Sequence, residues 1–143
     1  MKSYESMALI NASPELIWSI LTDAHGYTQW ESGVVRLEGQ IALGQALKVT
    51  SEANPNRAFP LKVTELITDT RMVWTGGMPL GLFKGVRTFT LSPEPDSMTR
   101  FRMREEYTGP LLPLIWGSMP DLQPSFDKFA QGLKSRAERA GVS

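Results

Sequence analysis

The pattern of apolar and polar positions along the chain changes its period three times. Residues 4–11 have the character of a first strand, and residues 13–15 (Ser-Pro-Glu) then mark a helix start. A hydroxyl at the N-cap, a proline at the first helical position and a carboxylate near the positive helix end all favour that start. Apolar residues within 16–21 recur at i, i+4 spacing until residues 23–26 end the pattern, which predicts a short helix. Residues 27–30 are expected to form a further helical turn.

The chain between Val34 and Thr108 contains short segments rich in β-branched and aromatic residues, separated by Gly, Pro, Asn and Asp. We expect strands at about residues 34–39, 46–52, 59–68, 71–76, 82–91 and 98–108. A parallel crossover normally needs a dozen or more residues, so connections this short predict antiparallel neighbours. Residues 92–97 are expected to form the turn between the last two strands.

The C-terminal region returns to a helical period. Residues 123–140 carry one apolar stripe, and Pro124 suits the first turn of a helix there. The members of the stripe are Phe126, Phe129, Ala130, Leu133, Ala137 and Ala140. Residues 111–120 are very apolar but are interrupted by two prolines and a glycine, which predicts a kinked and adjustable segment instead of a straight helix.

These elements predict one α+β domain over residues 1–143, with an antiparallel sheet of about seven strands and a long C-terminal helix. The composition, 41% apolar and 21% charged, is that of an ordinary globular domain. No stretch approaches the ~20 apolar residues of a membrane span, so stable membrane insertion is not expected. Fifteen basic residues balance fifteen acidic ones, so no broad electrostatic attraction to nucleic acid or to anionic lipid is indicated, and neither is expected as a partner. The sequence does not decide between a monomer and a homodimer.

Few residues suit metal or nucleophilic chemistry. The chain has no cysteine, which fits a cytoplasmic protein, and its only histidine, His25, lies in a loop after the first helix. No glycine-rich phosphate motif is present, so we expect neither a metal nor a cofactor. Arg100, Arg102 and Arg104 recur at a period of two together with Glu106, which predicts the solvated face of a strand.

The order of elements and several short motifs resemble the START-like SRPBCC superfamily, and in particular its polyketide cyclase/dehydrase-like members. The resemblance rests on residues 11–18 (NASPELIW), residues 63–65 and 72–76, residues 87–93 (RTFTLSP) and residues 105–109 (EEYTG). It implies a helix-grip fold, in which a curved sheet wraps around the C-terminal helix, with two short helices after the first strand. It also implies a deep cavity between sheet and helix, used in the superfamily for lipids, polyketides and other apolar ligands.

Aromatic residues and methionines supply candidates for lining that cavity. We interpret Trp18 and Trp74 as core residues, because large aromatic side chains in regular elements usually pack inside. Trp30 and Trp116 lie in irregular segments and are predicted at the pocket rim. The remaining apolar candidates are Phe89, Phe101, Met103 and Met119.

Two charged residues interrupt an apolar strand face. Arg87 shares its face with Phe89, and Glu105 shares its face with Met103 and Tyr107. If the turn pairs Leu91 with Thr99, Arg87 lies opposite Met103 and one diagonal step from Glu105. One interpretation is that the two charges, with the Tyr107 hydroxyl, form the polar anchor of the pocket; the alternative is that a twist or bulge turns one of the two charges outward.

Three functions are compatible with this sequence. The first is binding of a lipid-like or polyketide-like apolar molecule. The second is a cyclase or dehydratase in which Glu105 or Tyr107 transfers a proton. The third is a protein-interaction role, as in relatives that act on a chaperone ATPase. A pocket filled by its own side chains would favour the third function, and an open pocket with convergent polar groups would favour the first two.

Overall fold

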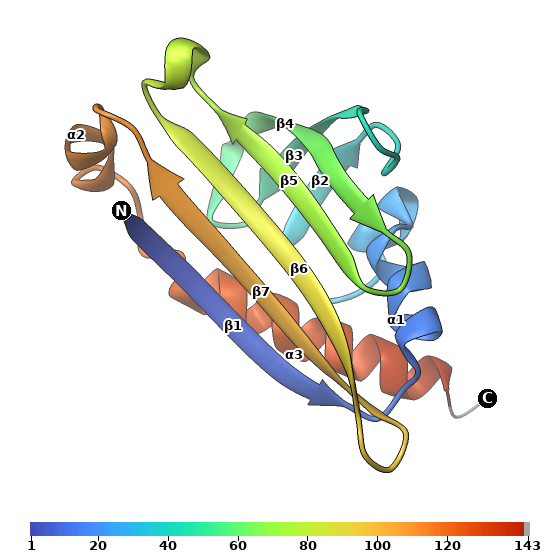
Figure 1. The fold of residues 1–143 in the computed structure, drawn as a ribbon. Helices are drawn as coiled ribbons and strands as arrows, with labels where there is room; N and C mark the ends of the chain where they lie inside the picture. Colours follow the sequence, from blue (N-terminus) through green and yellow to red (C-terminus); the bar gives the residue numbers. More distant parts are fainter. Residues whose placement is uncertain (142–143) are drawn as a thin grey trace.

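The computed structural model describes residues 1–141, and its centre is one antiparallel sheet of seven strands (Figure 1). The strands lie side by side in the order β1-β7-β6-β5-β4-β3-β2. Their bounds are β1 Lys2–Ile10, β2 Val34–Glu38, β3 Ala46–Ser51, β4 Asn54–Ile67, β5 Arg71–Gly77, β6 Lys84–Glu94 and β7 Met98–Thr108. The predicted antiparallel sheet is therefore confirmed.

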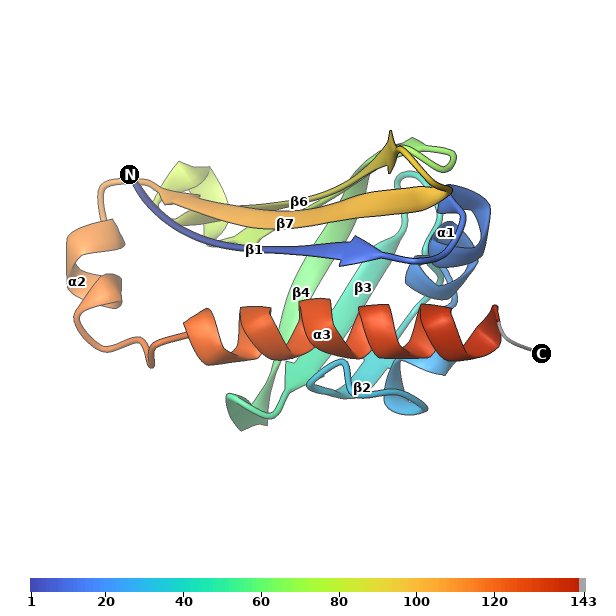
Figure 2. The same cartoon turned by 90° about the horizontal axis from the view of Figure 1, so that it is seen from below.

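Helices precede and follow the run of strands. Their bounds are α1 Pro14–Leu21, η1 Ala24–Thr28, η2 Pro79–Gly81, α2 Leu112–Trp116 and α3 Gln123–Ala140, where η denotes a 3₁₀ helix. Ser13 caps α1 as predicted, because its hydroxyl accepts a hydrogen bond of 3.1 Å from the Leu16 amide. The long helix α3 crosses the concave face of the sheet, with α1 at one end and α2 at the other (Figure 2). The helix-grip fold is confirmed.

The sheet curls because the strands on its β2 side carry irregular register. The pairing shifts between Val34 and Arg36 in β2, between Val49 and Ser51 in β3, and between Val63 and Glu65 in β4. Such bulges increase local twist, which bends a sheet. In Figure 2, β3 and β4 accordingly run steeply across the direction of β6 and β7.

The core fills the middle of the space between sheet and helix. Phe129 of α3 is 3% exposed, and its ring contacts the rings of Tyr27, Trp30, Phe89 and Phe101. Other side chains that are at most 1% exposed are Ile10, Ile17, Leu21, Leu47, Val63, Met72, Trp74, Met103, Leu133 and Ala137. The predicted stripe of α3 is therefore the seam of the fold from Phe126 to Ala137, whereas its last member, Ala140, is exposed.

The free edge of β1 is covered by polar side chains of α3. Gln123 donates a hydrogen bond of 2.8 Å to the carbonyl oxygen of Glu5, and Lys134 donates one of 2.6 Å to that of Leu9. The amide of Asn11 donates to Glu138 at 2.8 Å. Exposed strand edges invite pairing with other chains, so these contacts both fix the helix on the sheet and protect the edge.

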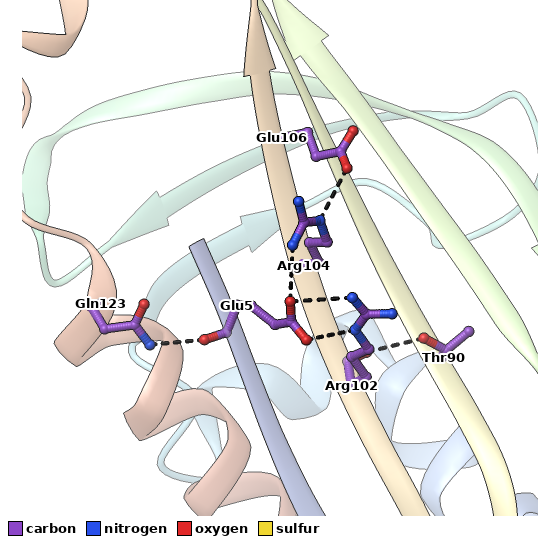
Figure 3. Close-up of polar contacts among 6 residues, drawn as sticks. All are labelled: Glu5, Thr90, Arg102, Arg104, Glu106 and Gln123. Atoms are coloured by element: carbon purple, nitrogen blue, oxygen red, sulfur yellow. Dashed lines mark hydrogen bonds and ion pairs between the residues drawn. The ribbon is translucent and has the colours of Figure 1, made fainter. Parts of the chain in front are cut away.

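The outer face of β1 and β7 carries a network of ion pairs (Figure 3). Arg102 makes two hydrogen bonds to Glu5, of 2.7 and 3.2 Å, and Arg104 contacts Glu5 and Glu106 at 3.0 Å each. The hydrogen bonds from Arg102 and Arg104 hold the pKa of the Glu5 carboxyl below its ordinary value. The arginines therefore belong to a solvated strand face, as predicted.

Candidate functional site

Four side chains lie in one row across the concave face of the sheet. Trp74 of β5 is directly opposite Arg87 of β6, which is opposite Glu105 of β7, which is opposite Tyr4 of β1. Directly opposite residues of antiparallel strands share one face. That face packs against α3, since the Arg87 guanidinium carbon lies 4.9 Å from the centre of the Phe126 ring. The two charges therefore point toward the helix, on the strand face that the alternation of apolar residues had predicted to be core.

Arg87 and Glu105 form an ion pair that is largely removed from water. Arg87 Nε donates a hydrogen bond of 3.1 Å to Glu105 Oε1, and the two side chains are 21% and 13% exposed. Removal of charges from water is costly unless they are paired and hydrogen-bonded. The Phe126 face beneath the guanidinium adds a cation–π contact. Each charge consequently depends on the other for its stability in this position.

Tyr107 completes the polar cluster. Its hydroxyl donates a hydrogen bond to Glu105 Oε2, so both carboxylate oxygens have a donor. Burial, together with the adjacent Glu105 charge, raises the pKa of Tyr107 far above its ordinary value. The phenol therefore keeps its proton throughout the physiological pH range. We call Arg87, Glu105 and Tyr107 the polar triad.

Aromatic rings surround the polar triad. The Tyr4 ring stacks on Trp116 of α2 at 5.3 Å between centres and lies 5.5 Å from Phe126. Trp116 also lies 5.6 Å from Tyr107. Phe83, just before β6, stacks on the other side of Tyr107 at 6.0 Å. The triad thus lies in apolar surroundings assembled from four separate parts of the chain, which strengthens its electrostatic contacts.

An open depression of about 480 Å³ adjoins this cluster at the end of β5 and the start of β6, beside the middle of β4. Its lining residues are Pro60, Leu61, Lys62, Thr75, Gly76, Gly77, Met78, Gly81, Phe83 and Lys84. Phe83 connects the depression to the triad, because it lines the former and stacks on Tyr107. Gly85 borders the triad. A Cβ atom there would be in van der Waals contact with the Tyr107 ring at 3.5 Å and with the Glu105 carboxyl carbon at 3.9 Å, so a larger side chain would occupy the space beside the triad.

The predicted site residues divide into two groups. Arg87, Glu105, Tyr107 and Trp116 come together as described. Phe89, Phe101 and Met103, which are at most 1% exposed, are core residues instead of an open lining, and Met119 is half-buried next to α2.

Trp30 does not lie at a pocket rim, contrary to our prediction. Its side chain is 8% exposed and packs edge-on against Phe129 and beside Tyr27. The turn that follows η1 places the Trp30 ring against Phe129 of α3, so the segment is irregular but buried.

The predicted strand register at the last hairpin was wrong by two residues. β6 continues to Glu94, which pairs with Met98, so the connection contains only residues 95–97. Asp96 and Ser97 adopt positive φ angles of 63° and 60°, which suits such a tight turn. Arg87 is consequently directly opposite Glu105, not diagonal to it.

Sequence reasoning missed Tyr4, Phe83, Gly85 and Phe126 as parts of the site. Phe126 was recognised only as a member of the helix stripe. For Tyr4 a signal existed, because an inward-facing tyrosine at the start of an edge strand must place its hydroxyl near a polar group or water. The period of two places Phe83 and Gly85 on the same strand face as Arg87, but their contact with Tyr107 depends on which strand lies beside them.

Two of the three buried polar side-chain atoms that lack a hydrogen-bond partner among residues 1–141 lie beside the triad. Trp74, whose Nε1 is one of them, shares the row of Arg87 and Glu105, and Ser6, whose Oγ is another, lies in the next row, opposite Met103. The third is Nε1 of Trp30, whose ring packs against Tyr27 and Phe129 instead. Buried polar groups nearly always have a partner, so Ser6 and Trp74 are exceptional positions in this part of the core. Residues 1–141 hold no group of three or more His, Cys, Asp or Glu side chains suited to a metal ion.

Comparison with protein families identifies a match over nearly the whole chain. Residues 1–138 match the family described as polyketide cyclase/dehydrase and lipid transport. No curated protein sequence matches the chain with significant similarity.

Several solved structures share the fold. Norcoclaurine synthase from Thalictrum flavum, in a point mutant bound to a transition-state analogue, is 17% identical with a TM-score of 0.74, covering 98% of this chain and 96% of its own. The protein MLL2253 from Mesorhizobium loti is 19% identical with a TM-score of 0.73, covering 96% and 98%. The Aha1 dimer from Colwellia psychrerythraea is 21% identical with a TM-score of 0.72, covering 96% and 97%. At these identities the likeness concerns the fold alone.

Proposed function

The chain belongs to the polyketide cyclase/dehydrase and lipid transport family, and from this premise we propose that it binds an apolar small molecule carrying a polar head group. The head group contacts the polar triad, and the apolar body lies in the depression beside Phe83. Family membership by itself leaves the ligand open, since one fold carries many functions. The proposal therefore rests on the site.

The observation that carries the proposal is the ion pair of Arg87 and Glu105 inside an aromatic enclosure. An ion pair in this position contributes little net stability compared with well-packed apolar residues. Its retention on the concave face is explained if a ligand uses it. Arg87 offers guanidinium donors suited to a carboxylate, phenolate or carbonyl oxygen, while Tyr107 and Glu105 offer a hydroxyl and an acceptor.

The surroundings fit a mostly apolar ligand. Phe83 and Met78 line the depression, and the tyrosine and tryptophan rings of Tyr4 and Trp116 border the triad. Small-molecule sites typically combine such apolar walls with a few convergent polar groups. The deep cavity that the resemblance implied is filled at its centre by Phe129 and its neighbours, an arrangement that by itself favours a protein-interaction role. The convergent polar groups of the triad beside an open depression favour a ligand instead, and its place is then at the end near α2 and not deep beneath the helix.

A second candidate is catalysis at the same place, of the cyclase or dehydratase kind. The hydrogen bond between the Tyr107 hydroxyl and Glu105 Oε2 favours it, because a carboxylate and a phenol in contact in dry surroundings can pass a proton to or from a bound carbonyl compound. In such a reaction Glu105 would accept the proton and Tyr107 would supply one. Binding must precede either role, so the test of binding comes first.

Native mass spectrometry of the protein purified from its source tests the proposal. We expect a small molecule to remain bound, and we expect it to be lost in Arg87→Met and in Gly85→Leu, whose side chain would occupy the space beside Tyr107. Arg102→Met, on the outer face, is the matched control and should retain it. Equal occupancy in all four proteins, or none in the native one, would reject the site.

A further inference from the structure

Exposed apolar side chains gather where the depression opens. Met78 and Leu82 are 43% and 36% exposed, Leu80 between them is 95% exposed, and Leu114 of α2 is 77% exposed. The backbone joins the two segments, because the Leu111 amide donates a hydrogen bond of 2.9 Å to the Leu82 carbonyl. Figures 1 and 2 both place η2 and α2 at the same end of the molecule. We call these four residues the apolar lip.

Leu80 is held in a conformation that leucine disfavours. Its φ and ψ angles of 62° and 20° lie in the left-handed region, where glycine is the usual residue. The structure here combines backbone strain with an almost fully exposed leucine side chain. Strain of this kind concentrates at functional segments. A turn selected for stability alone would carry glycine or asparagine at this position.

The lip borders the depression of the candidate site. Met78, Gly81 and Phe83 belong to the depression's lining and lie on the same loop as Leu80. A surface that covers the lip therefore also covers the opening through which an apolar ligand would pass. This inference rests on the proposed function for its purpose, but the contact itself can be measured without any ligand.

The charges around the lip are positive. Lys62 and Lys84 line the depression, and Lys2 lies with its ammonium 5.9 Å from the centre of the Trp116 ring. All three lysines are exposed. Residues 71–93 and 107–120 contain no Asp or Glu. The carboxylates that border these segments are engaged: Glu105 and Glu106 pair with Arg87 and Arg104, and Asp121 accepts a hydrogen bond from the Gln123 backbone amide. A chain of zero net charge thus places three lysines and exposed apolar side chains at this end.

We propose that the apolar lip docks on the surface of an anionic lipid bilayer, with Leu80 and Leu114 in the acyl boundary and the lysines at the head groups. Apolar tips flanked by basic residues bind such interfaces through buried area and electrostatic attraction together. A second copy of the chain fits less well, because an isologous interface would bring the same lysines of both copies together. Docking would let an apolar ligand pass between bilayer and site without crossing water.

Sedimentation with lipid vesicles tests this proposal. The protein is mixed with vesicles of phosphatidylcholine alone or of equal parts phosphatidylcholine and phosphatidylglycerol, and the bound fraction is measured at low and high salt. We expect binding to the phosphatidylglycerol vesicles that weakens with salt. Leu80→Gly and Leu114→Ser should each lower the affinity about tenfold, the effect of removing one buried leucine side chain. Leu80→Gly also relieves the left-handed strain, so loss of folding cannot explain its effect.

The matched control is Ile67→Thr. Ile67 is 48% exposed and lies near the β4–β5 turn, at the opposite end of β5 from Leu80, so its replacement should leave vesicle binding unchanged. Arg87→Met should also retain vesicle binding, which separates this proposal from that of the ligand site. The proposal is overturned by absence of vesicle binding or by an equal loss in Ile67→Thr. A dimer in light scattering that Leu80→Gly dissociates would overturn it as well, because a second copy would then cover the lip.

Discussion

The coupling between Arg87 and Glu105 gives the sharpest prediction about the site. Arg87→Met and Glu105→Gln each remove one member of a pair whose side chains are 21% and 13% exposed. Breaking a fully buried pair costs about 3–5 kcal/mol, because a charge is left without compensation. Here both groups keep some contact with water, so we expect about 2 kcal/mol for each single variant.

The double variant should cost less than the sum of the two single ones. With both charges gone, no uncompensated ion remains, and methionine packs well against Phe126. We expect a coupling energy of about 1–2 kcal/mol between the two positions. The outer pair of Arg102 and Glu5, 48% and 30% exposed, is the control and should give less than about 1 kcal/mol.

Urea denaturation followed by tryptophan fluorescence measures these energies, and thermal unfolding checks them, since about 1 kcal/mol shifts the midpoint of a domain this size by about 3–4 °C. Additive effects of Arg87→Met and Glu105→Gln would refute the reasoning. So would a coupling no larger than that of the outer pair, because the concave-face pair would then behave as a solvated one.

Three further predictions follow from the fold. Leu133→Ala should cost about 2–5 kcal/mol in urea denaturation, since Leu133 is 0% exposed at the seam of α3, and an unchanged midpoint would contradict that burial. Hydrogen exchange should be faster in residues 111–120 than in residues 125–138, because the former hold only the short helix α2; equal protection would count against an adjustable segment. The Arg102 hydrogen bonds lower the folded-state pKa of Glu5, so their stabilisation is complete above the unfolded pKa of about 4.3 and is lost as the pH falls through the folded value. Unfolding free energies at pH 7 and pH 3 should therefore differ less in Glu5→Gln than in the native protein.

The sequence predicted the strands well where one face is mostly apolar. β7 runs over residues 98–108 as expected, because Phe101, Met103 and Tyr107 alternate with charged residues that water can solvate. The inward position of Arg87 and Glu105 followed from the same alternation. Their direct pairing did not, because the hairpin register depends on the turn, and a three-residue turn with two positive φ angles was not recognised.

The surroundings of the triad were less predictable. Tyr4, Phe83 and Phe126 come from β1, the β5–β6 loop and α3, and only the packed chain shows that their rings meet around Tyr107 and Arg87. Periodicity identifies which face a residue occupies, but it does not identify the neighbours from distant segments. The prediction of Trp30 at a pocket rim was wrong because its segment has no apolar periodicity that would have indicated burial, yet the fold buries the side chain.

Titration with cis-parinaric acid, a fluorescent chain with one carboxylate, tests the central claim that the polar triad anchors an apolar ligand. Saturable binding to the native protein is expected, with its affinity lowered about tenfold or more in Arg87→Met, since loss of a charge-assisted hydrogen bond is worth at least about 1.4 kcal/mol. Arg102→Met should bind as the native protein does. Binding that is absent, or that is equally strong in Arg87→Met and Arg102→Met, would contradict the account.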